Sequence, residues 1–169
     1  MHLVRIFLLW ISRLLLGFTF IFSGFVKAID PVGSSIKFED YFSAMHLGIL
    51  APYALMFAFL LAAIEFLLGV NILLSLSPRQ SSHYVLVIMA FMTTLTLYLA
   101  IANPVSDCGC FGDAIKLTNW ETFAKNIVLL AAAIHYYKNR HGVAHVYHHK
   151  IHWGTIYPHF CVCVGSLFP

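Results

Sequence analysis

Four long apolar segments dominate the sequence, at residues 6–26, 50–76, 84–102 and 120–137. A helix needs about 20 apolar residues to cross the hydrocarbon core of a bilayer, and each segment comes close to or exceeds that length. Only 10% of the residues are charged, whereas about a quarter are charged in soluble domains. The sequence therefore predicts an all-α fold, a polytopic four-helix bundle in contact with membrane lipid.

The connecting segments differ in length and character. The loop 27–49 contains IKFEDYFSAMHL, which predicts a short amphipathic helix on the membrane surface, and a short loop is expected at 77–83. Residues 139–169 hold six of the ten histidines and end in an apolar stretch that is marginal for a fifth span. The abrupt end at Phe168-Pro169 suggests a shortened or altered C-terminus. We therefore expect a membrane domain at 1–138 and a His-rich tail at 139–169.

The distribution of basic residues predicts the orientation. Because basic residues are enriched in cytoplasmic loops, the larger basic group favours a cytoplasmic N-terminus and C-terminus. The loop at 107–113 then faces outward, which in a bacterial inner membrane means the periplasm. The small net charge of +3 forms no basic stripe and predicts no nucleic acid partner. The larger group is Arg5, Arg79, Lys138, Arg140 and Lys150, and the smaller is Lys27, Lys37 and Lys116.

The heptapeptide DCGCFGD at 107–113 places two thiols, Cys108 and Cys110, one residue apart. A disulfide that closes so short a loop would stabilise the fold by only about 1.6 kcal/mol. Strained, accessible disulfides are commonly labile or catalytic. Two interpretations remain open, a redox pair for thiol–disulfide exchange and a tight turn of small residues.

Charged residues inside the apolar segments are costly and need partners. Arg13 and Lys27 share one face of the first helix with Gly17 and Gly24, so a neighbouring helix can approach closely between two cations. Glu65 lies deep in the second helix, at a depth that differs from that of Arg13 by about 8 Å. We predict an Arg13–Glu65 ion pair that either fixes helix register or serves a proton relay or quinone site.

The fourth helix begins at a capping-box pattern, Thr118-Asn119-Trp120-Glu121. Lys125 follows by one turn and is expected near the same outer boundary as Lys27. Nearby cations favour the reactive thiolate form of a cysteine, so both lysines are candidate activators of the dithiol. The alternative is that Lys125 extends to the interface without meeting a sulfur.

Metal ligation is the weaker interpretation of the tail. His141, His145 and His149 are spaced four apart and could share a helical face suited to a transition metal. A solvated or membrane-surface tail is favoured instead. The second CxC pair, Cys161 and Cys163, lies about 50 residues from the first, a spacing that fits a zinc site poorly. We expect no metal site.

Three further stretches stand out: RLLLGFTFIFSGFVKAIDP at 13–31, EFLLGVNILL at 65–74, and DCGCFGD with NWETFAKNIVLL within 107–130. Together they resemble the DoxX-like superfamily and most closely its methylamine utilisation protein MauE family. The likeness covers about the first 138 residues. It implies a four-helix inner-membrane protein that supports disulfide formation in a periplasmic enzyme, with a thioredoxin-like partner. It supports Cys108 and Cys110 as the redox pair, with Arg13, Gly24, Lys27 and Glu65 as shared features.

Three functions remain open from the sequence. The first is a component of a thiol–disulfide oxidoreductase that uses Cys108 and Cys110. The second is a non-catalytic membrane subunit that anchors an oxidoreductase or helps to hold a quinone, the one cofactor suggested. The third is a small-solute carrier with a glycine-lined, charged interior.

Overall fold

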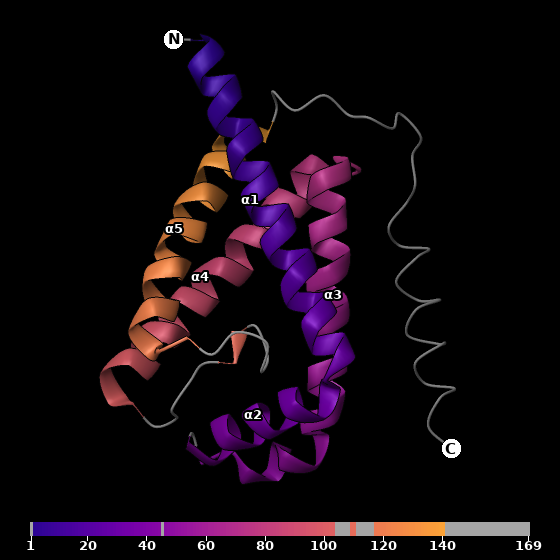
Figure 1. The fold of residues 1–169 in the computed structure, drawn as a ribbon, viewed down its shortest axis with the longest axis vertical. Helices are drawn as coiled ribbons and strands as arrows, with labels where there is room; N and C mark the ends of the chain where they lie inside the picture. Colours follow the sequence, from indigo (N-terminus) through magenta and orange to yellow (C-terminus); the bar gives the residue numbers. More distant parts are fainter. Residues whose placement is uncertain (1, 45, 104–108, 111–116, 141–169) are drawn as a thin grey trace.

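The computed structural model describes residues 2–44, 46–103, 109–110 and 117–140 (Figure 1). Within them α1 lies along α3 and α4 lies along α5, and α1 also contacts α5. The predicted all-α fold is confirmed for these residues. The helices are α1 (His2–Ile29), α2 (Pro31–Ala44), α3 (Ala54–Leu74), α4 (Pro78–Ala102) and α5 (Asn119–Lys138), and a 3₁₀ helix, η1 (Gly48–Tyr53), precedes α3.

The surface and the interior have the distribution expected in lipid. Large apolar side chains such as Phe18, Phe91 and Ile101 are more than 60% exposed, whereas Arg13 and Lys27 are buried. Lipid chains pack well against apolar side chains but cannot form hydrogen bonds. Polar groups in a membrane protein must therefore find partners inside the protein. Together with three helical segments long and apolar enough to cross a bilayer, Val4–Ile29, Gly48–Leu74 and Pro78–Ala102, this confirms a helical membrane protein.

The prediction of four apolar spans needs a correction at α5. Three helical segments within the described residues reach the apolarity of a span, and α5 does not. Glu121, Lys125, Asn126 and His135 make this 20-residue helix more polar. Part of that polarity faces inward, since Asn126 Nδ2 donates to Thr96 Oγ1 of α4 at 3.2 Å. Helix α5 thus completes the bundle as its most polar member.

The predicted capping box at the start of α5 is confirmed. The Glu121 backbone N–H donates to Thr118 Oγ1 at 3.3 Å. The Thr118 backbone N–H donates to Glu121 Oε2 at 2.9 Å. These reciprocal bonds satisfy two amides that the helix itself leaves without partners, so α5 begins directly after the loop that carries the cysteines.

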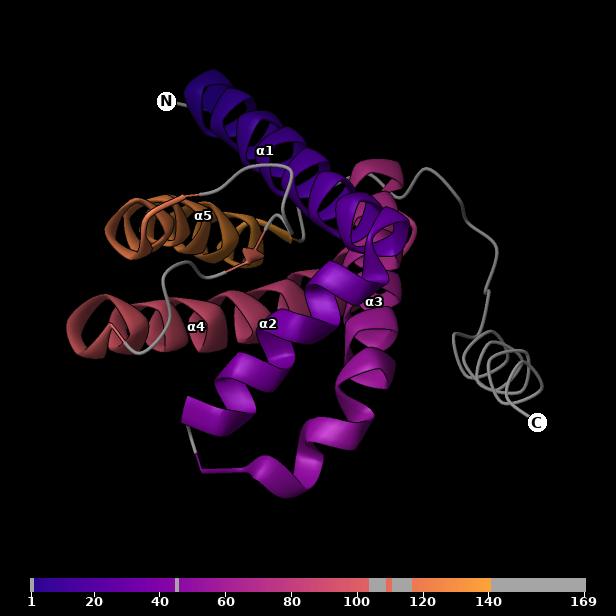
Figure 2. The same ribbon diagram turned by 60° about the horizontal axis from the view of Figure 1, so that its bottom comes forward.

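Helix α2 is the helix predicted in the loop 27–49, and it begins earlier than expected, at Pro31. Proline suits the first helical position, and Asp30 caps the helix because its Oδ1 accepts from the Gly33 N–H at 2.8 Å. Phe38 and Phe42 of α2 pack on Phe57 of α3, and their ring centroids lie 6.2 and 5.6 Å from that of Phe57. Figures 1 and 2 show α2 crossing one end of the bundle. Its position on the membrane surface stays a prediction.

The loop predicted at 77–83 is wrong, because α4 already begins at Pro78. A turn of three residues joins α3 to α4, with Ser75 in a left-handed conformation at a φ of 51°. Asn71 Oδ1 accepts from the Ser77 N–H at 3.1 Å and closes the turn. Proline suits the first position of a helix, and Pro78 occupies that position in α4.

Glycines set the contact between α1 and α3, as the sequence predicts. A Cβ added to Gly24 would lie 2.6 Å from the backbone oxygen of Ala62, and one added to Gly69 would lie 2.7 Å from the backbone nitrogen of Ile21. The two backbones therefore touch. Close approach of this kind is typical of helix pairs in membranes, and it fixes which residues lie at the same depth.

Candidate functional site

The register of α1 against α3 overturns the predicted Arg13–Glu65 ion pair. Gly24 lies against Ala62 and Phe66, so Glu65 is level with Gly24 and one turn from Lys27. Arg13 is eleven residues from that level, which is about 16 Å along a helix. The partner of Glu65 is Lys27, whose Nζ lies 2.8 Å from Glu65 Oε2.

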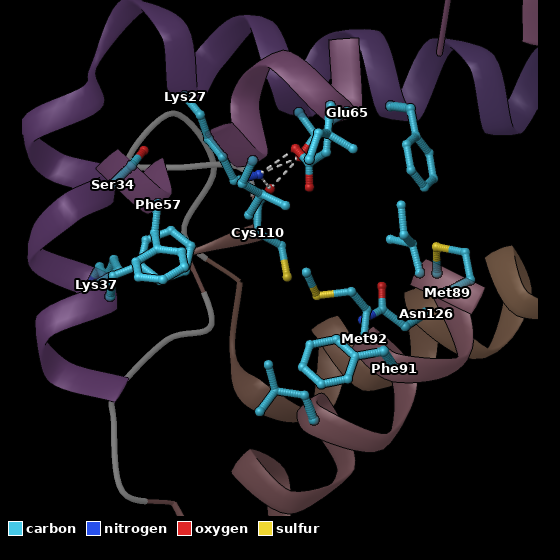
Figure 3. Close-up of a pocket in the computed structure, with 18 of the residues that line it drawn as sticks. Lys27, Ser34, Lys37, Phe57, Glu65, Met89, Phe91, Met92, Cys110 and Asn126 are labelled. Atoms are coloured by element: carbon cyan, nitrogen blue, oxygen red, sulfur yellow. Dashed lines mark hydrogen bonds and ion pairs between the residues drawn. The ribbon is translucent and has the colours of Figure 1, made fainter. Parts of the chain in front are cut away.

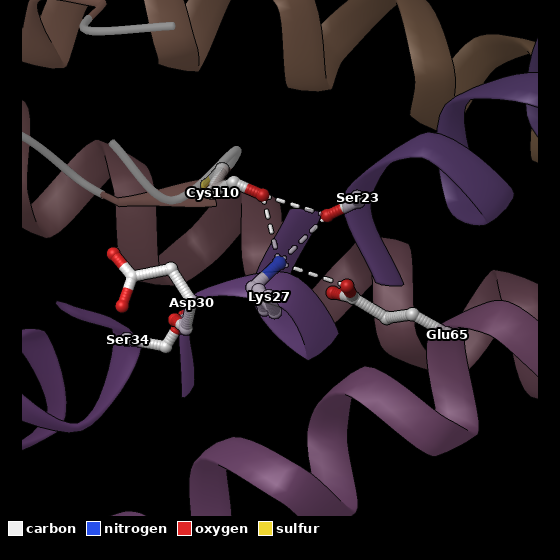
Figure 4. Close-up of polar contacts among 6 residues, drawn as sticks. All are labelled: Ser23, Lys27, Asp30, Ser34, Glu65 and Cys110. Atoms are coloured by element: carbon white, nitrogen blue, oxygen red, sulfur yellow. Dashed lines mark hydrogen bonds and ion pairs between the residues drawn. The ribbon is translucent and has the colours of Figure 1, made fainter. Parts of the chain in front are cut away.

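Lys27 ties three parts of the chain together (Figure 4). Besides its ion pair with Glu65 of α3, its Nζ donates to Ser23 Oγ on α1 at 2.6 Å and to the Cys110 carbonyl oxygen at 2.8 Å. Ser23 Oγ donates to the same carbonyl at 2.6 Å. The side chains of Lys27 and Glu65 are only 5% and 9% exposed. An ammonium group has three donors, and here all three are used, so Cys110 is held by a buried, fully bonded cation.

Arg13 has a different task at the other end of α3. Its Nη2 donates to the Leu73 carbonyl at 3.0 Å and to the Ile72 carbonyl at 3.3 Å, and it also contacts Ser75 Oγ. The last carbonyls of a helix lack partners within the helix and carry partial negative charge. Arg13 therefore caps the C-terminus of α3 and lies apart from the cysteine loop.

Gly109 fixes the backbone directly before Cys110. Its φ is +60°, a conformation that costs residues with a Cβ about 1–2 kcal/mol. A Cβ at this position would also lie 2.8 Å from Cγ of Lys37 on α2. Lys37 of α2 thus packs against Gly109, and only glycine fits there without strain.

We expect Gly109→Ala to displace the backbone at Cys110. The left-handed conformation costs alanine about 1–2 kcal/mol, and the new methyl group would meet the side chain of Lys37. Cys110 should then react faster with a soluble alkylating reagent. The double variant Gly109→Ala/Lys37→Ala removes the contact but keeps the backbone cost. Its rate of Cys110 alkylation should therefore lie between those of the wild type and the single variant. Unchanged alkylation in the single variant would contradict this account of Gly109.

Cys110 lies at the edge of a cavity of about 330 Å³ that all five α-helices line. Figure 3 shows its side chain pointing into this space. The wall is mainly apolar, and two of its polar groups, Ser23 and Lys27, bond to the Cys110 carbonyl. The polar lining includes Ser23, Lys27, Ser34, Lys37, Glu65, Lys125 and Asn126, and the apolar lining includes Phe38, Phe57, Leu61, Phe91 and Met92.

The structure brings together four of the six predicted site residues, namely Cys110, Lys27, Glu65 and Lys125, which all line the cavity. Arg13 lies apart from them, and Cys108 is outside the described residues. Sequence reasoning missed Ser23, Lys37 and Gly109. Ser23 had a signal, since it precedes Lys27 by one helical turn. The contact of Lys37 with Gly109 had none, because it joins distant segments.

A comparison with known families decides the relationship. The family model of methylamine utilisation protein MauE matches residues 5–138. The chain belongs to this family. The match spans all five α-helices apart from the first residues of α1 and includes the site around Lys27. With its three long apolar segments, the chain is therefore a membrane protein of the methylamine utilisation type.

Other comparisons add nothing to the MauE assignment. Neither curated proteins nor solved structures gave a match. The wider DoxX-like resemblance stays a prediction. In the part of the chain that the structure describes, no group of three or more His, Cys, Asp or Glu side chains could hold a metal ion. The histidines at 141, 145 and 149 and the second CxC pair lie outside that part.

Proposed function

We propose that this MauE family member is a component of a thiol–disulfide redox pathway that supports the maturation of a partner protein in the periplasm. The observation that carries the proposal is the double anchor on the Cys110 carbonyl, from Lys27 Nζ at 2.8 Å and Ser23 Oγ at 2.6 Å. Burying an ion pair costs the desolvation of two charges, and a simple turn does not require it. A buried pair is well suited to fixing a reactive group in place.

In the proposed exchange, one thiolate of the CxC pair attacks a disulfide, or a partner thiolate attacks the CxC disulfide. When a CxC thiolate attacks a partner disulfide, the second CxC thiol resolves the mixed disulfide and the partner is reduced. When a partner thiolate attacks the CxC disulfide, the partner's second thiol resolves the mixed disulfide, so the partner is oxidised and the CxC pair is reduced. Cys108 and Cys110 supply the two sulfurs. Lys125 lines the cavity into which Cys110 points, and we propose that its ammonium group favours the thiolate. Lys27 is instead paired with Glu65 and holds the Cys110 carbonyl. A thioredoxin-like periplasmic protein is the partner that we propose.

The proposal includes a topology. The chain lies in the bacterial inner membrane with its N-terminus in the cytoplasm and the cysteine loop on the periplasmic side. Arg5 of α1 bonds to Asn139 beyond the end of α5, so both helix ends lie together and opposite the loop. A membrane-impermeant alkylating reagent should label Cys110 in intact cells only after mild reduction. Labelling only after permeabilisation would contradict this orientation.

Serine variants test the redox role. Cys108→Ser and Cys110→Ser should each leave a dependent periplasmic disulfide protein reduced, because the exchange needs both thiols. Cys161→Ser and Cys163→Ser are the matched controls and should leave it oxidised. The measurement is the redox state of that protein after acid quenching and alkylation. Normal oxidation in the first two variants would reject the proposal and favour a non-catalytic subunit that anchors an oxidoreductase.

A further inference from the structure

The cavity beside Cys110 opens through an apolar edge. Three of its lining residues are also exposed on the outer surface: Leu60 is 49%, Ile64 is 37% and Phe91 is 62% exposed. Leu60 and Ile64 belong to α3 and Phe91 to α4, both of which are long and apolar enough to cross a bilayer. The opening therefore faces hydrocarbon, and a molecule dissolved in the membrane can enter between α3 and α4.

The interior suits a planar ring with polar substituents. Its volume of about 330 Å³ is within the range of small-molecule sites, about 300–1,000 Å³. Aromatic side chains line the apolar part, among them Phe38, Phe57 and Phe91. A ligand that stacks on these rings can keep an apolar chain toward the opening.

Three lysines and one glutamate are the charged side chains among the described lining of the cavity. They are Lys27, Lys37, Lys125 and Glu65. Lysine ammonium groups donate hydrogen bonds, and they favour a ligand whose oxygens accept such bonds and gain negative charge when the ligand is reduced. Cys110 points into the same space (Figure 3), so its sulfur faces whatever the cavity binds.

We infer that the cavity binds a membrane-dissolved quinone, which accepts electrons from the CxC thiols. The inference rests on the proposed redox function and names its electron acceptor. A thiol pair that oxidises partner proteins must itself be reoxidised. The reagent that reaches Cys110 from the cavity side must be lipophilic, because the opening lies in the membrane. Quinones combine that solubility with a ring and two carbonyl oxygens.

The exchange balances without a further reagent. Cys108 and Cys110 lose two electrons and two protons as their S–H bonds break and one S–S bond forms. The quinone takes up two electrons and two protons and becomes the quinol. One reduced chain therefore yields one quinol.

Photolabelling of the purified full chain in lipid nanodiscs tests binding separately from redox chemistry. The probe is an azido-substituted decylbenzoquinone, and its sites are mapped by mass spectrometry. We expect labels on residues 60–65 of α3 and 88–92 of α4. Unlabelled decylubiquinone should remove them, and decylbenzene, which has the chain without the carbonyl oxygens, should not. Equal competition by decylbenzene would overturn the inference and indicate a site for lipid chains.

Matched variants place the ligand in the cavity. Leu61→Trp places a larger side chain in the cavity and should lower photolabelling about tenfold. A tenfold change corresponds to about 1.4 kcal/mol in the free energy of binding. Leu55→Trp is the control on the same helix, since Leu55 is 38% exposed and does not line the cavity. Equal labelling in both variants would overturn the inference.

Cys110→Ser separates this inference from the redox function. The variant should keep photolabelling but form no quinol, whereas the reduced wild-type chain should form one quinol. If labelling persists and the dependent disulfide protein is oxidised normally in Cys110→Ser, the redox function fails and the quinone site stands alone. If Cys110 is needed for that oxidation but competitive labelling is absent, the quinone inference fails and the redox function stands.

Discussion

Lys27→Met is expected to destabilise the protein by about 3–5 kcal/mol, the usual cost of removing one partner of a buried ion pair. The carboxylate of Glu65 is left buried without its cation, and the Cys110 carbonyl loses one of its two anchors. The midpoint of thermal unfolding should fall, measured as the fraction of detergent-solubilised protein that stays monodisperse after heating. Lys138→Met is the control, because Lys138 is exposed at the end of α5.

The double variant Lys27→Met/Glu65→Met separates the effect on stability from the effect on the position of Cys110. Apolar residues that replace a buried ion pair are often neutral or stabilising, so the double variant should recover most of the lost stability. The Cys110 carbonyl still lacks its ammonium donor, and Cys110 should remain more reactive toward alkylation than in the wild type. A single variant as stable as the wild type would show that the ion pair does not support the fold.

The elements of the fold were predictable where short-range physics decides them. Long apolar runs predicted the membrane helices, and Thr118 with Glu121 predicted the start of α5. The glycines of α1 predicted a close helix neighbour because a missing Cβ leaves room for one. The loop expected at 77–83 is shorter in the structure because Pro78 begins α4, and proline is as suited to the start of a helix as to a loop.

The ion pair could not be predicted because it depends on register. The expected partner for Glu65 followed from depths counted from the ends of the apolar segments. The depth at which α1 meets α3 depends instead on backbone contacts such as that of Gly24 with Ala62. At the depths counted from the segment ends Glu65 lies within reach of Arg13, whereas at the observed register it lies one turn from Lys27. Cys110 joined the same cluster only through its carbonyl, a group that every residue has.

Gly24→Val should destabilise the protein because it pushes α1 away from α3. Even the Cβ of alanine would lie 2.6 Å from both the Ala62 oxygen and the Phe66 nitrogen, which are backbone atoms that cannot rotate away. Overfilling a packed site costs typically about 1–3 kcal/mol, so Gly24→Ala should already lower the midpoint of thermal unfolding, and Gly24→Val should lower it further.

Two other glycines make this a graded test. At Gly17 an added Cβ would meet the end of the Leu73 side chain, which can rotate, so Gly17→Ala should cost less than Gly24→Ala. At Gly48 nothing lies within 4 Å, so Gly48→Ala should leave the midpoint unchanged. Because Gly24 lies one turn before Lys27, Gly24→Val should also weaken the ion pair with Glu65 and speed alkylation of Cys110. Equal midpoints for Gly24→Ala and Gly48→Ala would mean that α1 and α3 do not meet at their backbones, and the register that joins Lys27 to Glu65 would then be wrong.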